Sequence, residues 1–337
     1  MRTSVLRGVG DVVLEERPVP EPGPREVLIQ VASVGVCGSD VHYYEHGRIG
    51  QHIVRRPLVL GHEASGTVVA LGPQATRNTV GQRVSLEPGV PDFTCEQCRA
   101  GRYNLCPDVR FFATPPIDGA FSEYVVLHES FAHPVPESLS DDAAALLEPL
   151  SVGVWACRKA DVGPGDKVLV NGAGPIGLVA AQTALAFGAT EVVATDVNPV
   201  RLRLAAELGC TSVIDVTDTP LAEAGFQPDV LLECSGHPGA TRAAICTVAR
   251  AGRVVLVGMG GDEIGLPLSY VQEHELLLTG TFRYANTWST AIALASSGRV
   301  DLDRLVTGRY PLAEVETALT SGSRDPKSVK PIVRPGE

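Results

Sequence analysis

A glycine-rich turn, Gly172-Ala-Gly-Pro-Ile-Gly177, constrains the fold of this chain more than any other sequence feature. Before the turn, Lys167–Asn171 has the length and the β-branched residues of a short buried strand. After it, Pro175–Phe187 is uncharged and reads as a helix, with Gly188 as its C-terminal cap. A strand, a tight turn and a helix in this order predict a βα unit of a parallel sheet.

The turn and the acid that follows it suit a nicotinamide dinucleotide. Gly172 would allow the tight turn, Gly174 the close approach of the pyrophosphate, and Gly177 the packing of the helix on the sheet. Asp196 ends the next strand, 22 residues after Gly174, and would accept hydrogen bonds from the adenosine ribose. Because a carboxylate repels a 2′-phosphate, NAD is predicted over NADP, although Arg201 is near enough to accommodate that phosphate. The alternative is a βα turn that binds no ligand. The expected cofactor residues here are Gly172, Gly174, Pro175, Ile176, Gly177, Asp196 and Arg201.

The alternation of strands and helices continues through the second part of the chain. Further strands are expected at Glu191–Thr195, Ser212–Asp215, Asp229–Cys234, Arg253–Val257 and Leu276–Thr281, and further helices at Asn198–Leu208 and Ala240–Ala249. This order predicts a parallel sheet covered on both faces. The last fifty or so residues read as helix, strand, helix and a tail.

Before residue 150 the pattern is different, with short β-branched runs separated by turns. Strands are expected at Glu26–Val34, Ala64–Leu71, Gln82–Leu86 and Ser122–Leu127. Such spacing, in a chain with 35 glycines and 25 prolines, predicts a β-barrel or sandwich. A length of 337 residues and two distinct patterns predict two domains.

Composition and charge exclude several classes of function. The chain has 28 Lys and Arg against 39 Asp and Glu, and its net charge of −11 argues against a nucleic-acid partner. The uncharged stretch Val168–Thr190 is long enough to span a membrane, but its glycines and Pro175 favour strand, turn and helix. The first residues lack the apolar core of a secretory signal, so we expect a cytoplasmic protein without a membrane partner. Because that compartment is reducing, we do not expect the eight cysteines to form disulfide bonds.

Four residues of the first part could hold a metal ion. Cys37 offers a thiolate, His62 an imidazole, and Glu63 and Glu148 carboxylates, all of which suit zinc. Spacing alone also allows purely structural roles, because Cys37 could be a small buried residue, His62 a turn residue and Glu148 the start of a helix.

Several segments in one order resemble the zinc-dependent medium-chain dehydrogenase/reductase family, in particular its sorbitol (L-iditol) and xylitol dehydrogenases. They span residues 35–288 and read GVCGSDVHYYEHGRIG, VLGHEASGTV, GRYNLCPDVRFFATPPIDGAFSEY, LLEPLSVGVWAC, GAGPIG and GTFRYANTW. The resemblance implies an α/β protein with a GroES-like β-barrel catalytic domain over residues 1–149 and 287–337. It implies a doubly wound Rossmann domain over residues 150–286, and a homotetramer.

The resemblance also assigns roles to the candidate metal ligands. Cys37, His62 and Glu63 would ligate a catalytic Zn²⁺, and Glu148 would either ligate it or hold its water. Alcohol dehydrogenases of the wider family have Cys at the position of Glu148, whereas the sorbitol-like branch has Glu. We expect the more oxygen-rich site to suit a substrate dense in hydroxyl groups.

Proton release and substrate binding would use residues near these ligands. The resemblance implies a proton relay through Ser39 and His42, with the water held by Glu148 as the alternative; Ser39 could also be a turn residue and His42 a surface residue. The residues implied to line the substrate pocket are Tyr43, Glu148, Arg283 and Tyr284. The residues expected at the cofactor edge of the late strands are Val257, Gly258, Met259, Thr281, Phe282 and Arg283.

A second, structural zinc site is expected in a cysteine-rich segment. Cys95, Cys98 and Cys106 match three of the four cysteines of the family pattern, and Asp92 stands where that pattern has the first. Aspartate can ligate zinc through oxygen, so a site with three thiolates and one carboxylate is one interpretation. The other is an empty lobe with three free thiols.

We therefore expect an NAD-dependent, zinc-dependent polyol dehydrogenase that converts a secondary alcohol into a ketose. A dehydrogenase of the same family acting on L-threonine, butanediol or an aldose is the alternative enzyme. A non-catalytic structural or ligand-sensing member is the alternative of another class, which the intact metal residues disfavour.

Overall fold

The computed structural model describes residues 1–261 and 263–337, which form two compact units. Unit 1 comprises Met1–Glu148 and Leu302–Glu337, and unit 2 comprises Pro149–Asp301. The chain therefore leaves the first unit to build the second and then returns to it.

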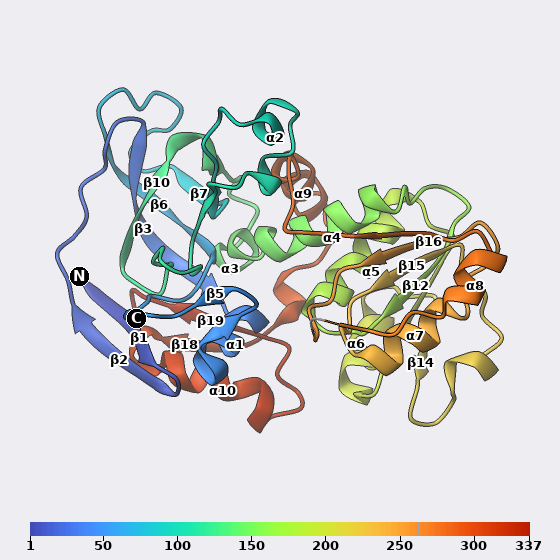
Figure 1. The fold of residues 1–337 in the computed structure, drawn as a ribbon. Helices are drawn as coiled ribbons and strands as arrows, with labels where there is room; N and C mark the ends of the chain where they lie inside the picture. Colours follow the sequence, from blue (N-terminus) through green and yellow to red (C-terminus); the bar gives the residue numbers. More distant parts are fainter. Residues whose placement is uncertain (262) are drawn as a thin grey trace. The chain divides into compact units, whose positions relative to one another are not determined.

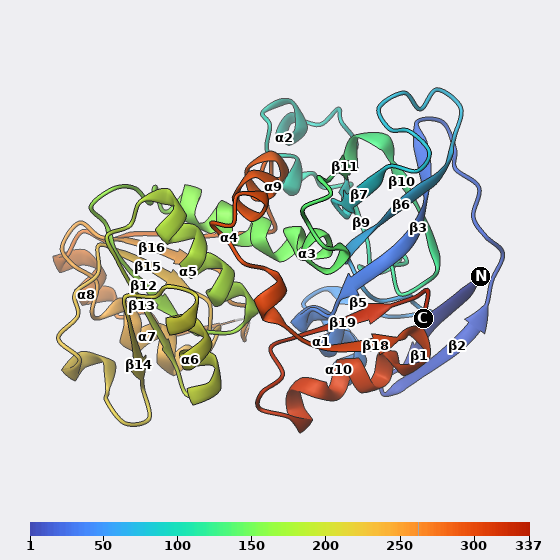
Figure 2. The same cartoon turned by 180° about the vertical axis from the view of Figure 1, so that it is seen from behind.

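Unit 2 is built on a parallel six-stranded sheet in the order β14-β13-β12-β15-β16-β17. Helices lie on both faces of this sheet (Figures 1 and 2). The α/β class and the parallel sheet predicted from the sequence are confirmed. The strands are β12 (Lys167–Asn171), β13 (Glu191–Asp196), β14 (Ser212–Asp215), β15 (Val230–Glu233), β16 (Arg253–Leu256) and β17 (Leu277–Gly280). The helices are α4 (Leu147–Lys159), which starts in unit 1, α5 (Pro175–Phe187), α6 (Pro199–Glu207), η3 (Leu221–Glu223), α7 (Pro238–Ile245), α8 (Leu268–Glu273) and α9 (Trp288–Ser296).

The order of these strands reverses beside β12. From β12 the chain first adds β13 and β14 on one side, and then β15, β16 and β17 on the other. The point where the order reverses, between β12 and β15, is where open α/β sheets bind ligands at the carboxyl ends of their strands.

Local capping sets the ends of the helices in unit 2. Asn198 accepts hydrogen bonds from the backbone N–H groups of Val200 and Arg201, which confirms it as the N-cap of α6. The helix expected at Ala240–Ala249 instead begins at Pro238 and ends at Ile245. Its start is earlier because the His237 side chain accepts from the backbone N–H of Ala240.

Unit 1 is a mainly antiparallel β structure around a separate core. Its seven-stranded sheet has the order β11-β7-β6-β3-β19-β18, and β10 also pairs with β3. The long strand β3 alternates buried Val27, Ile29 and Val31 with more exposed residues, so one face packs on the core. The strands are β1 (Arg2–Gly8), β2 (Asp11–Glu16), β3 (Glu26–Gly35), β4 (Arg48–Ile49), β5 (His52–Ile53), β6 (Glu63–Leu71), β7 (Arg83–Leu86), β8 (Gly89–Val90), β9 (Arg110–Phe111), β10 (Tyr124–His128), β11 (Ala132–Pro134), β18 (Val306–Pro311) and β19 (Lys330–Arg334).

The tail expected from the sequence contains strand β19, which enters the sheet beside β3. Figure 1 shows these red C-terminal strands next to the blue N-terminal ones. The other elements of unit 1 are α1 (Gly38–His46), α2 (Glu96–Arg99), η1 (Tyr103–Leu105), η2 (Glu129–Phe131), α3 (Asp141–Ala145), η4 (Asp303–Leu305), η5 (Leu312–Glu314) and α10 (Val315–Arg324).

The return to unit 1 occurs at Leu302 rather than at the expected residue 287. Helix α9 stays in unit 2 because Arg158 donates to the Asn286 carbonyl at 2.7 Å and to Thr290 at 2.7 Å. The backbone N–H of Asp301 also donates to Gln182 at 2.7 Å. The two compact units thus divide at Glu148/Pro149 and Asp301/Leu302, whereas the GroES-like and Rossmann domains were expected to divide at 149/150 and 286/287, and those domain limits stay a prediction.

A buried carboxylate links the C-terminal segment of unit 1, which begins at Leu302, to the N-terminal part of the unit. Asp142, which is 1% exposed, accepts hydrogen bonds from Ser33 at 2.7 Å, Arg309 at 2.7 Å and Arg334 at 3.0 Å. Although burial opposes ionisation, these partners lower the pKa of Asp142. The ionised carboxylate therefore stabilises the joined segments.

No helix within residues 1–261 and 263–337 has both the length and the apolar character needed to cross a membrane.

Candidate metal and cofactor sites

The N-terminus of α1 organises the first cluster of ligating side chains. Cys37 precedes the helix, and Asp40 in its first turn accepts from the Cys37 backbone N–H at 3.0 Å. The other oxygen of Asp40 accepts from the backbone N–H of Gly61 at 2.9 Å. One buried carboxylate thus holds the Cys37 segment against the segment that carries His62 and Glu63.

The structure brings together Cys37, His62 and Glu63, with one ligand atom of each within 4.8 Å of the others. Ligands on a tetrahedral zinc lie roughly 3.3–3.8 Å apart, given bonds of about 2.0–2.3 Å. A thiolate, an imidazole and a carboxylate at these separations fit zinc after small side-chain movements.

Asp40 also acts on His62 and was not singled out from the sequence. Nδ1 of His62 lies 3.7 Å from the Asp40 carboxylate. Burial disfavours the charged imidazole, but the charge of Asp40, with a contribution from Cys37, raises the pKa of His62 well above its usual range. Because a metal binds neutral imidazole, metal binding here releases that proton. An acid three residues after Cys37, in the first turn of a helix, was the available signal.

Lys330 is a second residue that the sequence did not reveal. Its Nζ donates to the two Glu63 carboxylate oxygens at 2.7 and 2.8 Å, and to the Val36 carbonyl at 3.0 Å. The lysine comes from β19, 267 positions from Glu63, so no local pattern links the two residues.

Glu148 lies in the first turn of α4 and is buried, with 5% exposure. Among the residues that the structure describes, it is not a member of the three-residue ligand cluster. Its charge still contributes to raising the pKa of Lys330. Glu148 therefore belongs to the same electrostatic environment as Glu63.

The other residues predicted near the metal lie on α1. Tyr43 is 4% exposed, Ser39 is half-buried, and His42 is exposed and packs edge-on against His46 with ring centres 5.3 Å apart. The helix thus leads from the ligand cluster at its N-terminus to an exposed imidazole about one turn later.

A second cluster contains Asp92, Cys95, Cys98 and Cys106, whose ligand atoms also lie within 4.8 Å of one another. An oxygen of Asp92 accepts from the backbone N–H groups of Thr94 at 2.8 Å and Cys95 at 3.0 Å. These bonds lower the pKa of Asp92 to about 2, with Cys95 as the larger cause. An ionised carboxylate and three sulfurs fit a closed zinc site.

The glycine turn has the backbone that the sequence predicts for a dinucleotide site. Gly172 has a φ of 101°, which favours glycine. A Cβ on Gly177 would lie 1.8 Å from the Gly172 carbonyl oxygen, whereas a Cβ on Gly174 would meet nothing within 4 Å. The first and last glycines are therefore required by packing, and the middle one leaves space in front of the N-terminus of α5.

The Asp196 carboxylate binds the backbone of this turn and of the segment that follows β13. One carboxylate oxygen accepts from the Ala173 backbone N–H at 2.7 Å, and the other from the N–H groups of Val197 at 2.8 Å and Asn198 at 2.9 Å. Nε of Arg201, on α6, is buried without a hydrogen-bond partner. Asp196 is the last residue of β13, and α6, which carries Arg201, begins three residues later at Pro199.

The late strands end at the same edge of the sheet. The backbone N–H groups of Val257 and Gly258 both donate to the Glu233 carbonyl at 2.8 Å, and a Cβ on Gly258 would lie 2.4 Å from the backbone nitrogen of Gly236. Met259 is 58% exposed. These residues line the edge where the cofactor residues are expected.

The segment after β17 carries the remaining predicted residues. The Thr281 backbone N–H donates to the Leu256 carbonyl at 3.0 Å, and the Arg283 guanidinium lies 4.8 Å from the centre of the Phe282 ring. Tyr284 is buried against Trp288. Tyr43 belongs to unit 1 and Tyr284 to unit 2, so a common substrate pocket stays a prediction.

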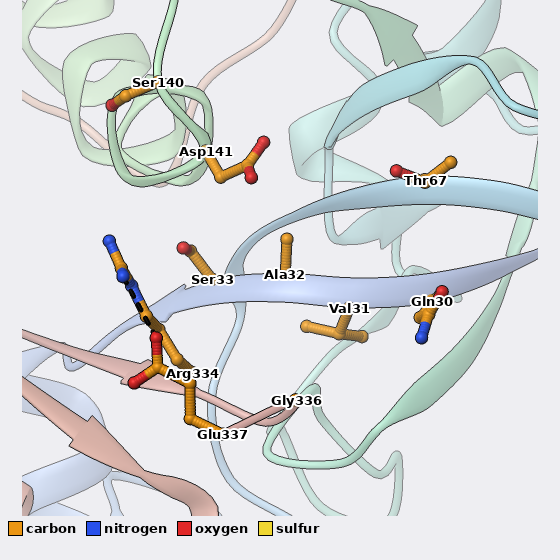
Figure 3. A pocket seen from close by; sticks show the side chains of 10 residues that line it. All are labelled: Gln30, Val31, Ala32, Ser33, Thr67, Ser140, Asp141, Arg334, Gly336 and Glu337. Carbon is orange, nitrogen blue, oxygen red and sulfur yellow. Dashed lines mark hydrogen bonds and ion pairs between the residues drawn. The ribbon is translucent and has the colours of Figure 1, made fainter.

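A hollow of about 520 Å³ in unit 1 lies apart from the predicted residues. Figure 3 shows Arg334 and Glu337 paired at one side and Asp141 facing them. Because Arg334 also pairs with Asp142, its charge is already balanced. The hollow is lined by Gln30, Val31, Ala32, Ser33, Thr67, Ser140, Asp141, Arg334, Gly336 and Glu337.

Comparison with known proteins gives matches along nearly the whole chain. Residues 23–137 match the alcohol dehydrogenase GroES-like domain, and residues 175–297 match the zinc-binding dehydrogenase domain. Sorbitol dehydrogenase of Bos taurus is 44% identical over 328 residues, which cover 95% of this chain and 92% of that protein. Sorbitol dehydrogenase of Bacillus subtilis (strain 168) is 41% identical over 326 residues, with the same coverage of both chains.

A solved structure extends the likeness to three dimensions. The short chain alcohol dehydrogenase from E. coli CFT073, complexed with the cofactor NADH, has a TM-score of 0.93 and 28% identity, and the match covers 99% of each chain.

Proposed function

We propose that this chain, which belongs to the zinc-dependent medium-chain dehydrogenase/reductase family and to its sorbitol dehydrogenase branch, oxidises a secondary alcohol of a polyol to a ketone and passes the hydride to NAD. The family and the GroES-like and Rossmann fold class predicted from the sequence are confirmed. The observation that carries the proposal is the similarity to sorbitol dehydrogenases over nearly the whole chain.

The proposed catalytic zinc ligands are Cys37, His62 and Glu63, with Glu148 as a further ligand or as the holder of a water. Zinc bound there supplies a Lewis acid that lowers the pKa of a substrate hydroxyl. Asp40 supports this role because it orients the Cys37 backbone and keeps His62 in place. Burial of Glu63 and Glu148 supports it as well, because it excludes the water that would weaken their charge interactions.

The hydride acceptor binds, in this proposal, along the carboxyl edge of the unit 2 sheet. The helix α5 N-terminus holds the pyrophosphate in the space in front of Gly174, and Asp196 receives the adenosine ribose. Arg201, on the helix α6 that follows Asp196, contacts the adenosine half of the cofactor in this proposal. The remaining proposed contacts are Gly172, Pro175, Ile176, Gly177, Val257, Gly258, Met259, Thr281, Phe282 and Arg283.

Ser39 and His42 carry the substrate proton to solvent in the proposed mechanism. The exposed His42 imidazole on α1 supports this route, because an exposed imidazole can exchange the proton with water near neutral pH. Glu148 provides the alternative route. Tyr43, Arg283 and Tyr284 would donate and accept hydrogen bonds with the several hydroxyls of a polyol.

A structural zinc held by Asp92, Cys95, Cys98 and Cys106 completes the proposed metal content. The ionised Asp92 carboxylate supports it, because the aspartate presents a hard anionic ligand where the family has a thiolate.

We also propose a cytoplasmic homotetramer. Strand β17 is an edge of the unit 2 sheet, and Leu277 on it and Leu268 on α8 are 68% and 64% exposed. An uncovered strand edge with exposed apolar side chains suits pairing with a second copy of the chain.

The experiment that tests the proposal is a substrate panel of sorbitol, xylitol, arabitol, L-threonine, butanediol and glucose. Each compound is assayed with NAD and with NADP, before and after treatment with a zinc chelator. We expect NAD reduction with a polyol that chelation abolishes. Turnover restricted to L-threonine, butanediol or glucose would identify the alternative enzyme, and no turnover with any compound would contradict the enzymatic function.

A further inference from the structure

Lys330 is an unusual residue to find inside a protein, because lysine is almost never fully buried unless it is paired. Its side chain is 3% exposed, and its Nζ donates hydrogen bonds to the Glu63 carboxylate and to the Val36 carbonyl. A buried ion pair contributes little net stability compared with apolar residues of the same shape. Stability alone therefore does not account for a lysine at this position.

The groups around Lys330 are mostly acidic. Burial by itself would lower the pKa of this lysine, but Glu63, and after it Cys37 and Glu148, raise that pKa. A thiolate and two carboxylates bring three negative charges, and a zinc ion brings two positive ones. The ammonium of Lys330 supplies a third positive charge, against which the buried Asp40 beside His62 adds a fourth negative one.

The backbone is shaped to keep Glu63 in contact with this ammonium. Gly35 lies opposite the carboxylate, and a Cβ there would come within 2.0 Å of a Glu63 oxygen. The Val36 carbonyl, one residue later, accepts from the same Nζ. Each Glu63 oxygen has two lone pairs, so it can accept from Lys330 and still face a metal ion.

We infer that Lys330 is a positioning residue of the metal centre: it holds the Glu63 carboxylate and withdraws negative charge from it, so that Glu63 binds zinc less tightly. This inference rests on the proposed role of Cys37, His62 and Glu63 as ligands. A weakly bound carboxylate leaves the zinc a stronger Lewis acid and lets Glu63 yield its place when a substrate hydroxyl arrives.

The test replaces Lys330 by methionine, which has a similar length and no charge. Mutation of an outer-shell partner usually weakens metal binding by about 10- to 100-fold. Here the partner removed is a cation that competes with the metal for the Glu63 charge, so we expect the opposite sign, with zinc loss to a chelator slower by roughly tenfold. After substitution of zinc by cobalt, the visible absorption of Lys330→Met should differ from that of the wild type. The cysteine-rich cluster contributes equally to both spectra and cancels in the difference.

Three further variants separate positioning from a structural role. Lys330→Arg should restore most of the wild-type cobalt spectrum, because it restores the charge. Lys330→Met combined with Glu63→Gln should show no spectral change relative to Glu63→Gln alone, because Lys330 acts through the Glu63 charge. Lys327→Met, at an exposed lysine three residues earlier, is the matched control and should behave as the wild type.

An unchanged cobalt spectrum in Lys330→Met, or faster loss of zinc, would overturn the inference and leave Lys330 a structural residue. A wild-type protein that takes up no cobalt at this cluster would overturn it as well. These measurements need no substrate. If no compound of the substrate panel is oxidised but Lys330→Met still changes the cobalt spectrum, the proposed function is rejected and the positioning role of Lys330 is kept.

Discussion

Two glycines of the unit 2 turn allow a test of the cofactor site, because a side chain at Gly177 would clash with the backbone and a side chain at Gly174 would not. We predict that Gly177→Ala destabilises the protein, whereas Gly174→Ala leaves it stable and blocks the cofactor. A Cβ at position 177 would stand 1.8 Å from the Gly172 carbonyl oxygen, and real Cβ contacts essentially never fall below 3.0 Å. The turn or the helix must therefore move by at least about 1.2 Å. At position 174 a Cβ meets no atom within 4 Å, and the φ of −69° suits any residue.

The size of the expected effect follows from the cost of overpacking. Forcing an extra methyl group into a packed site costs roughly 1–3 kcal/mol. For a unit of this size, each kcal/mol corresponds to about 2–4 °C in the melting temperature. Gly177→Ala should thus lower the midpoint by about 2–12 °C. For Gly174→Ala we expect a change of less than about 2 °C, and a Kd for NADH at least tenfold higher, about 1.4 kcal/mol.

Thermal unfolding followed by circular dichroism and titration with NADH followed by fluorescence measure the two effects separately. Normal melting of Gly177→Ala would refute the argument that its contact with the Gly172 carbonyl constrains the turn. Wild-type NADH affinity in Gly174→Ala would show that the pyrophosphate does not occupy the space in front of this residue.

Substitutions at three other positions test the remaining sites. Asp142→Asn should lower the free energy of unfolding by about 1–3 kcal/mol at pH 7, less than for a fully buried pair because Arg309 and Arg334 can be hydrated. The pKa of Asp142 is lower in the folded than in the unfolded protein, so its stabilising contribution is present above the unfolded pKa of about 3.9 and is lost as the pH falls through the folded pKa. Urea unfolding of the wild type and Asp142→Asn at several pH values measures this loss. A difference in unfolding free energy that does not change with pH would contradict the argument. Asp92→Ala should reduce the zinc content from about two ions to about one ion per chain in elemental analysis, whereas Asp92→Cys should retain both ions. Equal zinc contents in the wild type and these two variants would exclude Asp92 as a ligand. Asp196→Ala should weaken NADH binding and narrow its advantage over NADPH in fluorescence titrations, and an unchanged ratio would remove Asp196 from the ribose site.

Local sequence patterns predicted much of the fold, whereas the grouping of Cys37, His62 and Glu63 came from the family resemblance. The strand at Lys167–Asn171 and the helix at Pro175–Phe187 have the predicted ends, because capping and apolar content are local properties. The four residues of the cysteine-rich cluster lie within 15 positions of sequence, from Asp92 to Cys106, so their spacing was visible as well.

What the sequence did not reveal depends on distant partners. Lys330 meets Glu63 only because β19 enters the sheet beside β3, and this pairing has no local pattern. The boundary at Leu302 depends likewise on the hydrogen bond that Arg158 donates to the Asn286 carbonyl and the one that Gln182 accepts from the Asp301 backbone N–H, each across more than 100 positions.

The return of the chain to unit 1 also determines the order in which the protein can be completed during translation. Unit 2 is continuous in sequence, so all of its strands are synthesised before residue 302. The sheet of unit 1 must wait for β18 and β19, because β10 pairs with β3 only over Glu26–Gln30 and the Val34–Gly35 end of β3 meets β19. Glu63 is synthesised early and lacks its cation until Lys330 arrives, so the cluster that contains Glu63 is among the last parts of the nascent protein to be completed.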